Sequence, residues 1–266
     1  MPVPTPPPKP VMGLAAPHLI SLDAVGTLFG LRESVGTVYA RFAAQAGVGV
    51  AADALNRSFF QAFQAAPPCT FPNLAAAERA RAELEWWQAV AAETFARAGV
   101  LDQFQDFPAF FAPVFNYYAT ATPWQVYPEV LATLQAWQRQ GIPLIVISNF
   151  DSRLYGVLER LGLAPLLSAV FISSEVGAAK PNPQIFTQAI APFGLDPQQA
   201  WHIGDSWQED VVGAQAAQWQ PIWLRRSSPL LPQPDPAPPP TVVQISDLTA
   251  LNAILGCNAT SSPECL

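Results

Sequence analysis

A single aspartate at the end of an apolar run is the first residue of this sequence that could do covalent chemistry. The run at 19–22 leads directly into Asp23, and the turn-forming segment Val25-Gly26-Thr27 follows. Open α/β sheets place their reactive groups at the carboxyl ends of their strands, so Asp23 is a candidate nucleophile. The plainer interpretation is a turn aspartate ahead of a glycine. A second acid might be expected two residues on, but the sequence has Val25 there.

A hydroxyl and an amide follow another apolar run in the second half of the chain. Ser148 and Asn149 come after the run at 144–147. A hydroxyl beside exposed backbone N–H groups can hold a phosphate oxygen, so both residues are candidates for binding an anionic substrate. Taken alone, a simple Ser-Asn turn is the better interpretation, and the hypothesis depends on what the other strand ends carry.

Lysine is scarce, which draws attention to Lys180. It follows the apolar run at 169–172 and stands between Ala179 and a proline, and the sequence holds only one other lysine, Lys9. A cation at this place would hold Asp23 ionised and offset the charge of an anionic substrate. The alternative, an exposed surface lysine, is weakened by that scarcity.

A metal site with oxygen ligands is predicted at the end of the run at 200–204. Asp205 follows this run, and together with Asp23 it would offer the few carboxylates that suit Mg²⁺, a cation that keeps several waters. Asp210 is an uncertain third member, because an acid there also suits the N-cap or first turn of the helix that it would open. His202 is interpreted as a strand histidine satisfied by its neighbours.

The elements that must position these residues alternate along the second half of the chain. Strands are predicted at 18–23, 144–147, 169–172, 200–204 and 221–224, and helices at 128–140, 154–161, 184–193 and 210–218. A short strand end and a helix are expected at 245–255. This alternation predicts an α/β fold with a Rossmann-like, doubly wound parallel sheet.

A long block with helical periodicity separates the first strand from the rest of that sheet. Apolar residues recur at three-to-four spacing through 33–120, and no clear strand interrupts them. Trp86 and Trp87 lie in this block, and we expect one of them in the core and the other on the roof of a pocket. The predicted domains are a proline-rich flexible arm at 1–16, an α/β core at 17–32 and 121–256, an inserted all-helical cap at 33–120, and a tail at 257–266.

Composition limits the partners. The 266 residues carry a formal net charge of -7, which argues against a general nucleic-acid binder, since such a protein needs basic surface to displace counterions. No apolar stretch approaches the roughly 20 residues of a membrane span. The three cysteines have neither a paired framework nor a metal-binding spacing. We therefore expect a cytoplasmic monomer or homodimer that acts on a small anionic substrate, without a nucleic-acid or membrane partner.

Four segments in order resemble the motifs of the haloacid dehalogenase-like (HAD) hydrolases. They are Asp23 with Gly26-Thr27-Leu28, Ser148-Asn149, Lys180-Pro181, and Gly204-Asp205 with Asp210. Each motif is weak alone, but four at successive predicted strand ends are specific. Within the superfamily, "WWQAVAAETFARAGV" and "VISNFDSRL" are similar to the group called HAD-like hydrolase domain-containing protein 3. The resemblance covers roughly residues 17–255.

The resemblance implies Mg²⁺-dependent hydrolysis of a small phosphorylated metabolite through an aspartyl-phosphate. The implied roles are nucleophile for Asp23, its partner for Lys180, substrate binding for Thr27, Ser148 and Asn149, and metal binding for Asp23, Asp205 and the backbone carbonyl of Val25. In HAD phosphatases the second acid protonates the leaving oxygen and later activates water. Val25 cannot give a proton, and such help is typically worth about 10²–10⁴-fold, so we expect weak activity on ordinary phosphate esters.

Two other functions stay open. A HAD fold could bind an anion or a partner protein with little catalysis, and Val25 favours that alternative. A metal-independent 2-haloacid dehalogenase needs no proton for its departing halide, its Asp-Ala-Tyr-Gly-Thr pattern is close to residues 23–27, and Arg32 or Arg41 would supply its arginine. The predicted metal site argues against it. Phosphonoacetaldehyde hydrolases use a cap lysine, and 33–120 contains none. Phosphoglucomutase-type isomerases need the missing acid.

Overall fold

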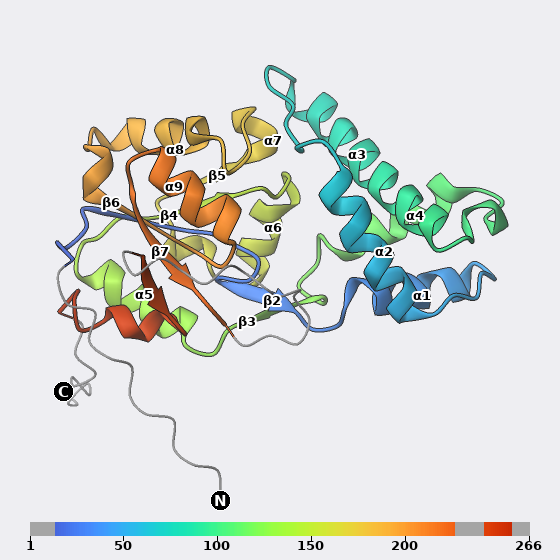
Figure 1. Cartoon of the computed structure of the whole chain (residues 1–266), viewed down its shortest axis with the longest axis horizontal. Helices are drawn as coiled ribbons and strands as arrows, with labels where there is room; N and C mark the ends of the chain where they lie inside the picture. Colours follow the sequence, from blue (N-terminus) through green and yellow to red (C-terminus); the bar gives the residue numbers. More distant parts are fainter. Residues whose placement is uncertain (1–13, 227–241, 257–266) are drawn as a thin grey trace, which may run out of the picture.

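A six-stranded parallel sheet organises the larger part of this computed structural model, which describes residues 14–226 and 242–256 (Figure 1). The order is β5-β4-β1-β6-β7-β8, and every neighbouring pair is parallel. The strands are β1 (Leu19–Leu22), β4 (Leu144–Ser148), β5 (Ala169–Ile172), β6 (Ala200–Gly204), β7 (Gln220–Leu224) and β8 (Val243–Ile245). The predicted fold class is confirmed. Most of the predicted arm and the whole of the predicted tail, at 1–13 and 257–266, lie outside the described residues.

The strand order places β1 between β4 and β6. Asp23 directly follows β1, and its backbone N–H donates to Ile203 of β6 at 2.9 Å. Ser148 ends β4 and Asp205 follows β6. These residues therefore meet at the carboxyl edge of three adjacent strands, the place where open α/β sheets bind their ligands.

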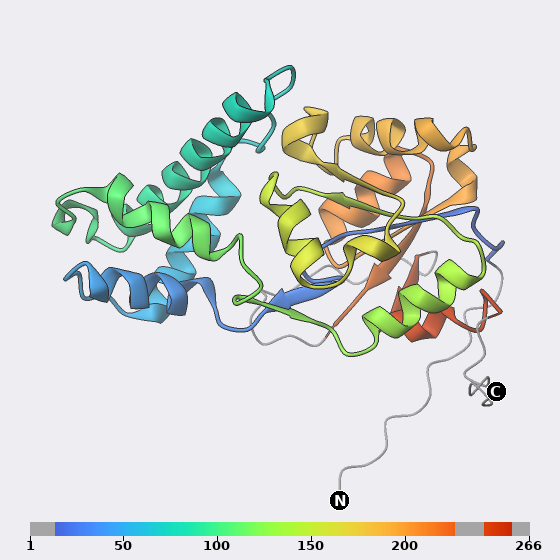
Figure 2. The ribbon, with the colours of Figure 1, turned by 180° about the vertical axis from the view of Figure 1, so that it is seen from behind.

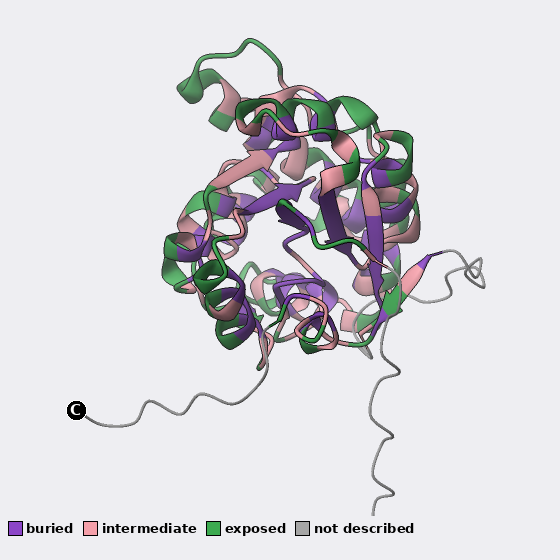
Figure 3. Cartoon of the chain, turned by 90° about the vertical axis from the view of Figure 1, so that its left-hand side faces the viewer, coloured by how far each residue is buried: buried purple, intermediate pink, exposed green. Residues whose placement is uncertain are grey.

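Both faces of the sheet are covered, as a parallel sheet requires. Alternate strand residues such as Ile20 and Val146 pack on one face with α5 (Val130–Arg139) and α6 (Arg153–Arg160). Leu19 and Ile147 point to the other face. They pack there with α8 (Pro183–Ile190) and α9 (Gly213–Ala216). Figure 3 shows the strands as buried ribbons with exposed helix surfaces around them.

A helical unit stands beside this sheet and has a hydrophobic core of its own. Its helices are α1 (Val35–Gln45), α2 (Ala52–Ala65), α3 (Ala76–Arg97) and α4 (Phe107–Tyr117), with a 3-10 turn, η1, at Leu101–Gln103. Figures 1 and 2 show it on one side of the molecule, with the α/β part on the other. The rings of Tyr39 and Phe95 stack at its centre, 5.6 Å apart. We call residues 33–120 the cap.

A two-stranded antiparallel ribbon carries the chain into and out of the cap. It pairs β2 (Phe29–Leu31) with β3 (Trp124–Val126), and Phe29 lies opposite Val126. Sequence periodicity did not predict this ribbon, because three residues are too few for an alternating pattern to show. The ribbon lies between the cap and the sheet in Figure 1.

The remaining short elements differ from the predicted ones in detail. The predicted helix at 210–218 begins earlier, as a π-helical segment, η5 (Trp207–Val212), that continues into α9. A single turn, α7 (Ser173–Val176), follows β5 directly. The other 3-10 turns are η2 (Ala164–Leu166), η3 (Ala191–Phe193), η4 (Pro197–Gln199) and η6 (Leu248–Leu251). Among the described residues, no helix is both long and apolar enough to cross a membrane.

Candidate active site

Lys180 joins two aspartates below the carboxyl edge of the sheet. Its Nζ donates to Asp23 Oδ1 at 2.7 Å and to Asp210 Oδ1 at 2.6 Å. The Lys180 side chain is fully buried, and those of Asp23 and Asp210 are 11% and 2% exposed. A buried cation is stable only when it is paired, and here two carboxylates pair with the Lys180 ammonium group.

His202 extends this chain of contacts into the sheet. Its Nε2 lies 2.9 Å from Asp210 Oδ1, and its Nδ1 lies 3.0 Å from the hydroxyl of Ser21 on the neighbouring strand. Burial lowers the pKa of His202, although Asp210 opposes the shift. A neutral imidazole that donates from Nε2 and accepts at Nδ1 satisfies both contacts. His202 is thus a satisfied strand histidine, and it helps to hold Asp210.

Asp210 lies in the first turn of η5, but it does not cap that segment. Ser206 is the N-cap, and its hydroxyl accepts from the backbone N–H of Glu209 at 3.2 Å. The N-cap interpretation of Asp210 is therefore wrong. Its second oxygen instead accepts from the backbone N–H of Ser206 at 2.9 Å. With Lys180 and His202 on the first oxygen, both oxygens of Asp210 are occupied.

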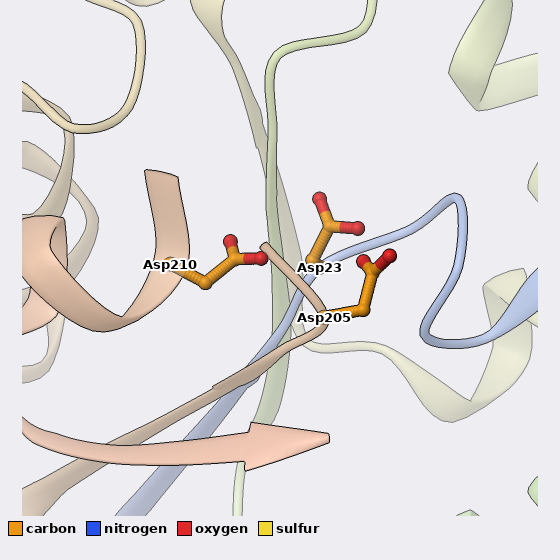
Figure 4. Close-up of side chains that lie close together, drawn as sticks. All are labelled: Asp23, Asp205 and Asp210. Atoms are coloured by element: carbon orange, nitrogen blue, oxygen red, sulfur yellow. The ribbon is translucent and has the colours of Figure 1, made fainter. Parts of the chain in front are cut away.

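Asp205 completes a group of three carboxylates, and two glycines make room for them. A Cβ on Gly26, which has φ +98°, would lie 2.3 Å from an oxygen of Asp205. A Cβ on Gly204 would lie 2.1 Å from the carboxyl carbon of Asp210. Figure 4 shows the three side chains, with Asp23 between the other two in this view. We call Asp23, Asp205, Asp210 and Lys180 the carboxylate floor.

The pKa values follow from burial and from this crowding. Burial raises the pKa of Asp23 to about 6, with Lys180 opposing the rise and Asp210 adding to it. Burial, Asp23 and Asp210 raise the pKa of Asp205 well above its usual range. Burial would also raise the pKa of Asp210, but Lys180 and His202 outweigh it and hold that pKa below the usual range. Burial alone would lower the pKa of Lys180, and its carboxylate partners raise it instead.

These carboxylates fit a divalent cation. Asp23, Asp205 and Asp210 each offer an oxygen, and the three oxygens lie within 4.8 Å of one another. Lys180 supplies one positive charge against three carboxylates, and burial first, with repulsion between the carboxylates second, raises the pKa values of Asp23 and Asp205. Hard oxygen donors suit Mg²⁺. Because Asp210 already accepts hydrogen bonds from Lys180, His202 and the Ser206 backbone, Asp23 and Asp205 have more free capacity as ligands.

The three predicted substrate-binding residues have different environments. Ser148 lies beside Asp23 on the wall of a cavity. The amide of Asn149 also reaches this wall, but its Oδ1 accepts from the backbone N–H of Lys180 at 2.7 Å and its Nδ2 donates to the Lys180 carbonyl at 2.9 Å. Asn149 therefore positions Lys180. Thr27 is fully buried and does not line the cavity, and its hydroxyl has no hydrogen-bond partner within residues 14–226 and 242–256.

The cavity has a volume of about 450 Å³ and opens above the carboxylate floor. Asp23, Val25 and Asp205 line its lower part. Glu209 lines it as well, and burial raises the pKa of that carboxyl to about 7. Its opposite wall comes largely from the cap. We call six of the rings on that wall the aromatic roof: Tyr39, Phe59, Phe63, Trp87, Phe111 and Phe115.

Buried polar contacts hold the roof over the floor. Trp87 Nε1 donates to Asp151 Oδ2 at 2.6 Å, and Asp151 is itself fully buried. Arg153 pairs with the same carboxylate at 2.6 Å. Nearby, Glu83 of α3 accepts from the backbone N–H of Ser152, at 3.1 Å, and from two serine hydroxyls of the α/β part. The segment after β4 and the turn α7 thus both form polar links between the two parts.

Sequence reasoning missed several residues of this site. Glu209, Asp151 and Arg153 had no assigned role, although the first stands beside Asp210 and the others closely follow Ser148-Asn149. Trp87 lines the cavity, whereas Trp86 donates to the Pro67 carbonyl at 2.9 Å and does not line it.

The arginines predicted for a dehalogenase lie elsewhere. Arg32 donates to the Trp124 carbonyl at 2.8 Å, and Arg41 pairs with Glu33 at 2.7 Å. Neither lines the cavity.

Comparison with known proteins agrees with this arrangement. The sequence model of the family described as "haloacid dehalogenase-like hydrolase" matches residues 17–218. This match confirms the family resemblance that the sequence motifs indicated. The chain belongs to the haloacid dehalogenase-like hydrolases.

Individual relatives extend this assignment. The chain is 34% identical to haloacid dehalogenase-like hydrolase domain-containing protein 3 of Bos taurus over 238 residues, covering 90% of this chain and 92% of the relative. It is 39% identical over 102 residues to a phosphoserine phosphatase of Thermus thermophilus, covering 38% and 41%. The structure of L-2-haloacid dehalogenase from Xanthobacter autotrophicus with chloropropionic acid covalently bound has a TM-score of 0.62 at 16% identity, covering 90% and 98%. That likeness shows the fold.

Proposed function

We propose that this HAD hydrolase is a Mg²⁺-dependent phosphatase that acts on a small phosphorylated metabolite through Asp23. The observation that carries this proposal is the Lys180–Asp23 ion pair at the floor of the cavity, 2.7 Å long and shielded from water. The partial likeness to a phosphatase supports the reaction type.

In the proposed reaction, a carboxylate oxygen of Asp23 attacks phosphorus. The bond between phosphorus and the leaving oxygen breaks, and that oxygen departs with the bonding electrons. Water then attacks the aspartyl-phosphate, the bond to Asp23 breaks, and inorganic phosphate is released with the carboxylate restored. The proton lost by water balances the proton that the alcohol gains. One P–O bond is hydrolysed for each molecule of water consumed.

Each floor residue has a separate part in this scheme. Lys180 keeps Asp23 ionised and offsets the phosphate charge, because a cation at 2.7 Å favours the carboxylate form. Asp210 and Asn149 hold Lys180 in place. Asp23 and Asp205 would hold Mg²⁺, with the Val25 carbonyl as a further predicted ligand. When bound, the ion would offset phosphate charge in the transition state.

Val25 favours a second function, the binding of a phosphorylated ligand with little turnover. No carboxylate stands at position 25, so the usual proton donor for the leaving group is absent. If the protein is mainly a binder, it should retain Mg²⁺-dependent affinity for phosphate without measurable hydrolysis.

The test is release of inorganic phosphate from acetyl phosphate and p-nitrophenyl phosphate, with and without Mg²⁺. Asp23→Asn should lower the rate by about 10⁴-fold or more, since it removes the attacking group. Asp53→Asn, an exposed aspartate at the start of α2, is the matched control and should have no effect. Full activity in Asp23→Asn would refute the assignment. Mg²⁺-independent chloride release from 2-chloropropionate would identify a dehalogenase instead.

A further inference from the structure

The cavity above Asp23 is much larger than a phosphate group needs. Its volume of about 450 Å³ lies within the range of roughly 300–1,000 Å³ that is usual for pockets that enclose whole small molecules. The phosphate would occupy the part beside Ser148 and the carboxylate floor. The rest of the space, under the aromatic roof, is left for the leaving group.

The aromatic roof is apolar and built of stacked rings. Phe63 stacks on Trp87 with centroids 5.8 Å apart and planes 19° apart, and Phe59 stacks on Phe63 at 5.7 Å with the same angle. The indole N–H of Trp87 is already bonded to Asp151. Gln64 and Tyr118 also line the cavity and could each meet a hydroxyl, but most hydroxyls of a sugar or polyol would lie against these rings without partners, which is costly. A flat apolar group would instead add to the stack.

Two arginines that line the cavity are already neutralised. Arg153 pairs with Asp151, and its guanidinium lies 3.7 Å from the centroid of Phe115. Arg226 pairs with Glu129 at 2.5 Å. Neither has free charge for a second anionic group of the substrate. A third arginine on the wall, Arg225, is exposed and stacks on Trp223. The buried space under the roof beside Arg153 therefore suits a neutral group, whereas the exposed guanidinium of Arg225 keeps its charge at the cavity wall.

Val25 points to the same kind of leaving group by an independent argument. Without the usual proton donor at position 25, a leaving oxygen that is stable as an anion is favoured. A phenol has a pKa of about 10, whereas that of water, the reference for a poorly leaving oxygen, is about 15.7. A phenolate is therefore the more stable anion, and aryl esters lose the least from the missing acid.

We infer that the site takes aryl phosphate monoesters, in which a phenol-type oxygen joins the phosphate to a flat apolar group of one or two rings. This inference rests on the proposed function and names its substrate class. Asp23 would displace the phenolate, with the ring held under the aromatic roof. The phenolate takes up a proton after it leaves, and water completes hydrolysis as described above.

The first test compares kcat/KM for 1-naphthyl phosphate, glycerol 1-phosphate and acetyl phosphate. Acetyl phosphate has a good leaving group but no ring, so it separates leaving-group chemistry from recognition by the roof. Trp87→Ala should lower the ratio of kcat/KM for 1-naphthyl phosphate to kcat/KM for acetyl phosphate about tenfold, within the range for losing an aromatic contact. Trp86→Phe, at a residue that does not line the cavity, keeps an aromatic ring against Trp87 and is the matched control. An equal loss of preference for 1-naphthyl phosphate over acetyl phosphate in both variants would overturn the inference.

The second test needs no turnover. Calorimetry with 1-naphthylmethylphosphonate and methylphosphonate compares binding of the ring-bearing and ring-free anions to the wild-type protein. We expect at least tenfold tighter binding of the naphthyl compound. Equal affinity, or no binding of either compound, would overturn the inference. Hydrolysis of acetyl phosphate without any naphthyl preference would leave the proposed phosphatase function intact. Naphthyl preference without hydrolysis of any ester would support the ligand class and reject the phosphatase.

Discussion

The carboxylate floor and the aromatic roof differ in what fixes their side chains. In the floor, Lys180 and Asp210 each make several charge-assisted hydrogen bonds, so their atoms have little freedom. In the roof, Phe59 and Phe63 are placed by stacking on one another, although Trp87 also donates a hydrogen bond to Asp151. The floor can therefore set the geometry of a reaction, while the roof can select a shape and tolerate change. This contrast predicts that substitutions below the cavity alter chemistry or folding, and those above it alter preference.

The largest expected effect is a gain in hydrolytic activity from a substitution at Val25, which lies beside the carboxylate floor. Val25→Asp should raise activity on an alkyl phosphate by up to ~10²–10⁴-fold, because it restores a proton donor for the leaving oxygen. The gain on p-nitrophenyl phosphate should be smaller, since that leaving group departs as a stable anion. Steady-state kinetics on both substrates would measure the difference.

The matched control for this gain is Val25→Asn, which has nearly the same shape but no titrating proton. It should show no gain. An added carboxylate beside Asp23 and Asp205 could disturb their pKa values, so folding and Mg²⁺ binding must first be verified in both variants. If a folded, Mg²⁺-binding Val25→Asp protein gains nothing on any phosphate ester, the site is not a phosphatase that lacks only its acid.

The next-largest expected effect is on the free energy of unfolding, and it compares the carboxylate floor with the aromatic roof directly. Lys180→Met should lower the free energy of unfolding by about 3–5 kcal/mol, because it leaves the buried carboxylates of Asp23 and Asp210 without their cation. Arg81→Met removes an exposed cation that pairs with Glu85, and it should cost less than about 1 kcal/mol. Trp87→Phe in the roof should also cost much less than Lys180→Met. Chemical denaturation at pH 7 measures all three.

The pH dependence of this loss checks its cause. With Lys180 in place, the pKa of Asp210 is depressed, so its contribution to stability is present above the unfolded-state pKa and is lost only as pH falls through the depressed value. Without Lys180, burial raises that pKa, and the stranded carboxylate takes up a proton as the pH falls. The difference in free energy of unfolding between the wild-type protein and Lys180→Met should therefore become smaller as the pH falls from 7 to 5. A constant difference would mean that lost packing is the cause.

The same contrast explains how much the sequence could predict. The meeting of Asp23, Ser148 and Asp205 could be predicted from the sequence, because each lies at the end of a predicted strand. Parallel strands bring their carboxyl ends to one edge of the sheet. For the roof, the sequence predicted only that one of Trp86 and Trp87 would face a pocket, and Trp87 does. Phe63, Trp86 and Trp87 fit helical periodicity equally well whether they face the cap core or a cavity, and only packing decides between these places. The partners of Glu83 and Asp151 lie on the other side of a chain insertion, and spacing cannot predict such contacts.

Mg²⁺ should stabilise the floor and leave the roof unaffected. An ion that binds only the folded chain adds about 2.7 kcal/mol at a hundred times its Kd, which corresponds to roughly 5–10 °C in Tm for a protein of this size. Asp205→Asn should lose most of this shift, and Trp87→Ala should keep it. Thermal unfolding with NaCl at matched ionic strength is the control. An unchanged shift in Asp205→Asn would remove Asp205 from the metal site.

The smallest expected effect tests whether Thr27 belongs to the floor at all. Its hydroxyl is fully buried and has no hydrogen-bond partner in the part of the chain that the structure describes, and an unsatisfied buried hydroxyl weakens a fold. Thr27→Val should therefore leave stability unchanged or raise it by up to ~1 kcal/mol. Thr94→Val is the matched control, because the Thr94 hydroxyl is equally buried but donates to the Val90 carbonyl at 2.8 Å, so its loss should cost about 0.5–1.5 kcal/mol. Thr27→Val should also leave KM for acetyl phosphate within about twofold, because Thr27 does not line the cavity. A large rise in KM without loss of stability would show that the hydroxyl contacts the phosphate, as the sequence motif predicts, and that the floor rearranges to expose it.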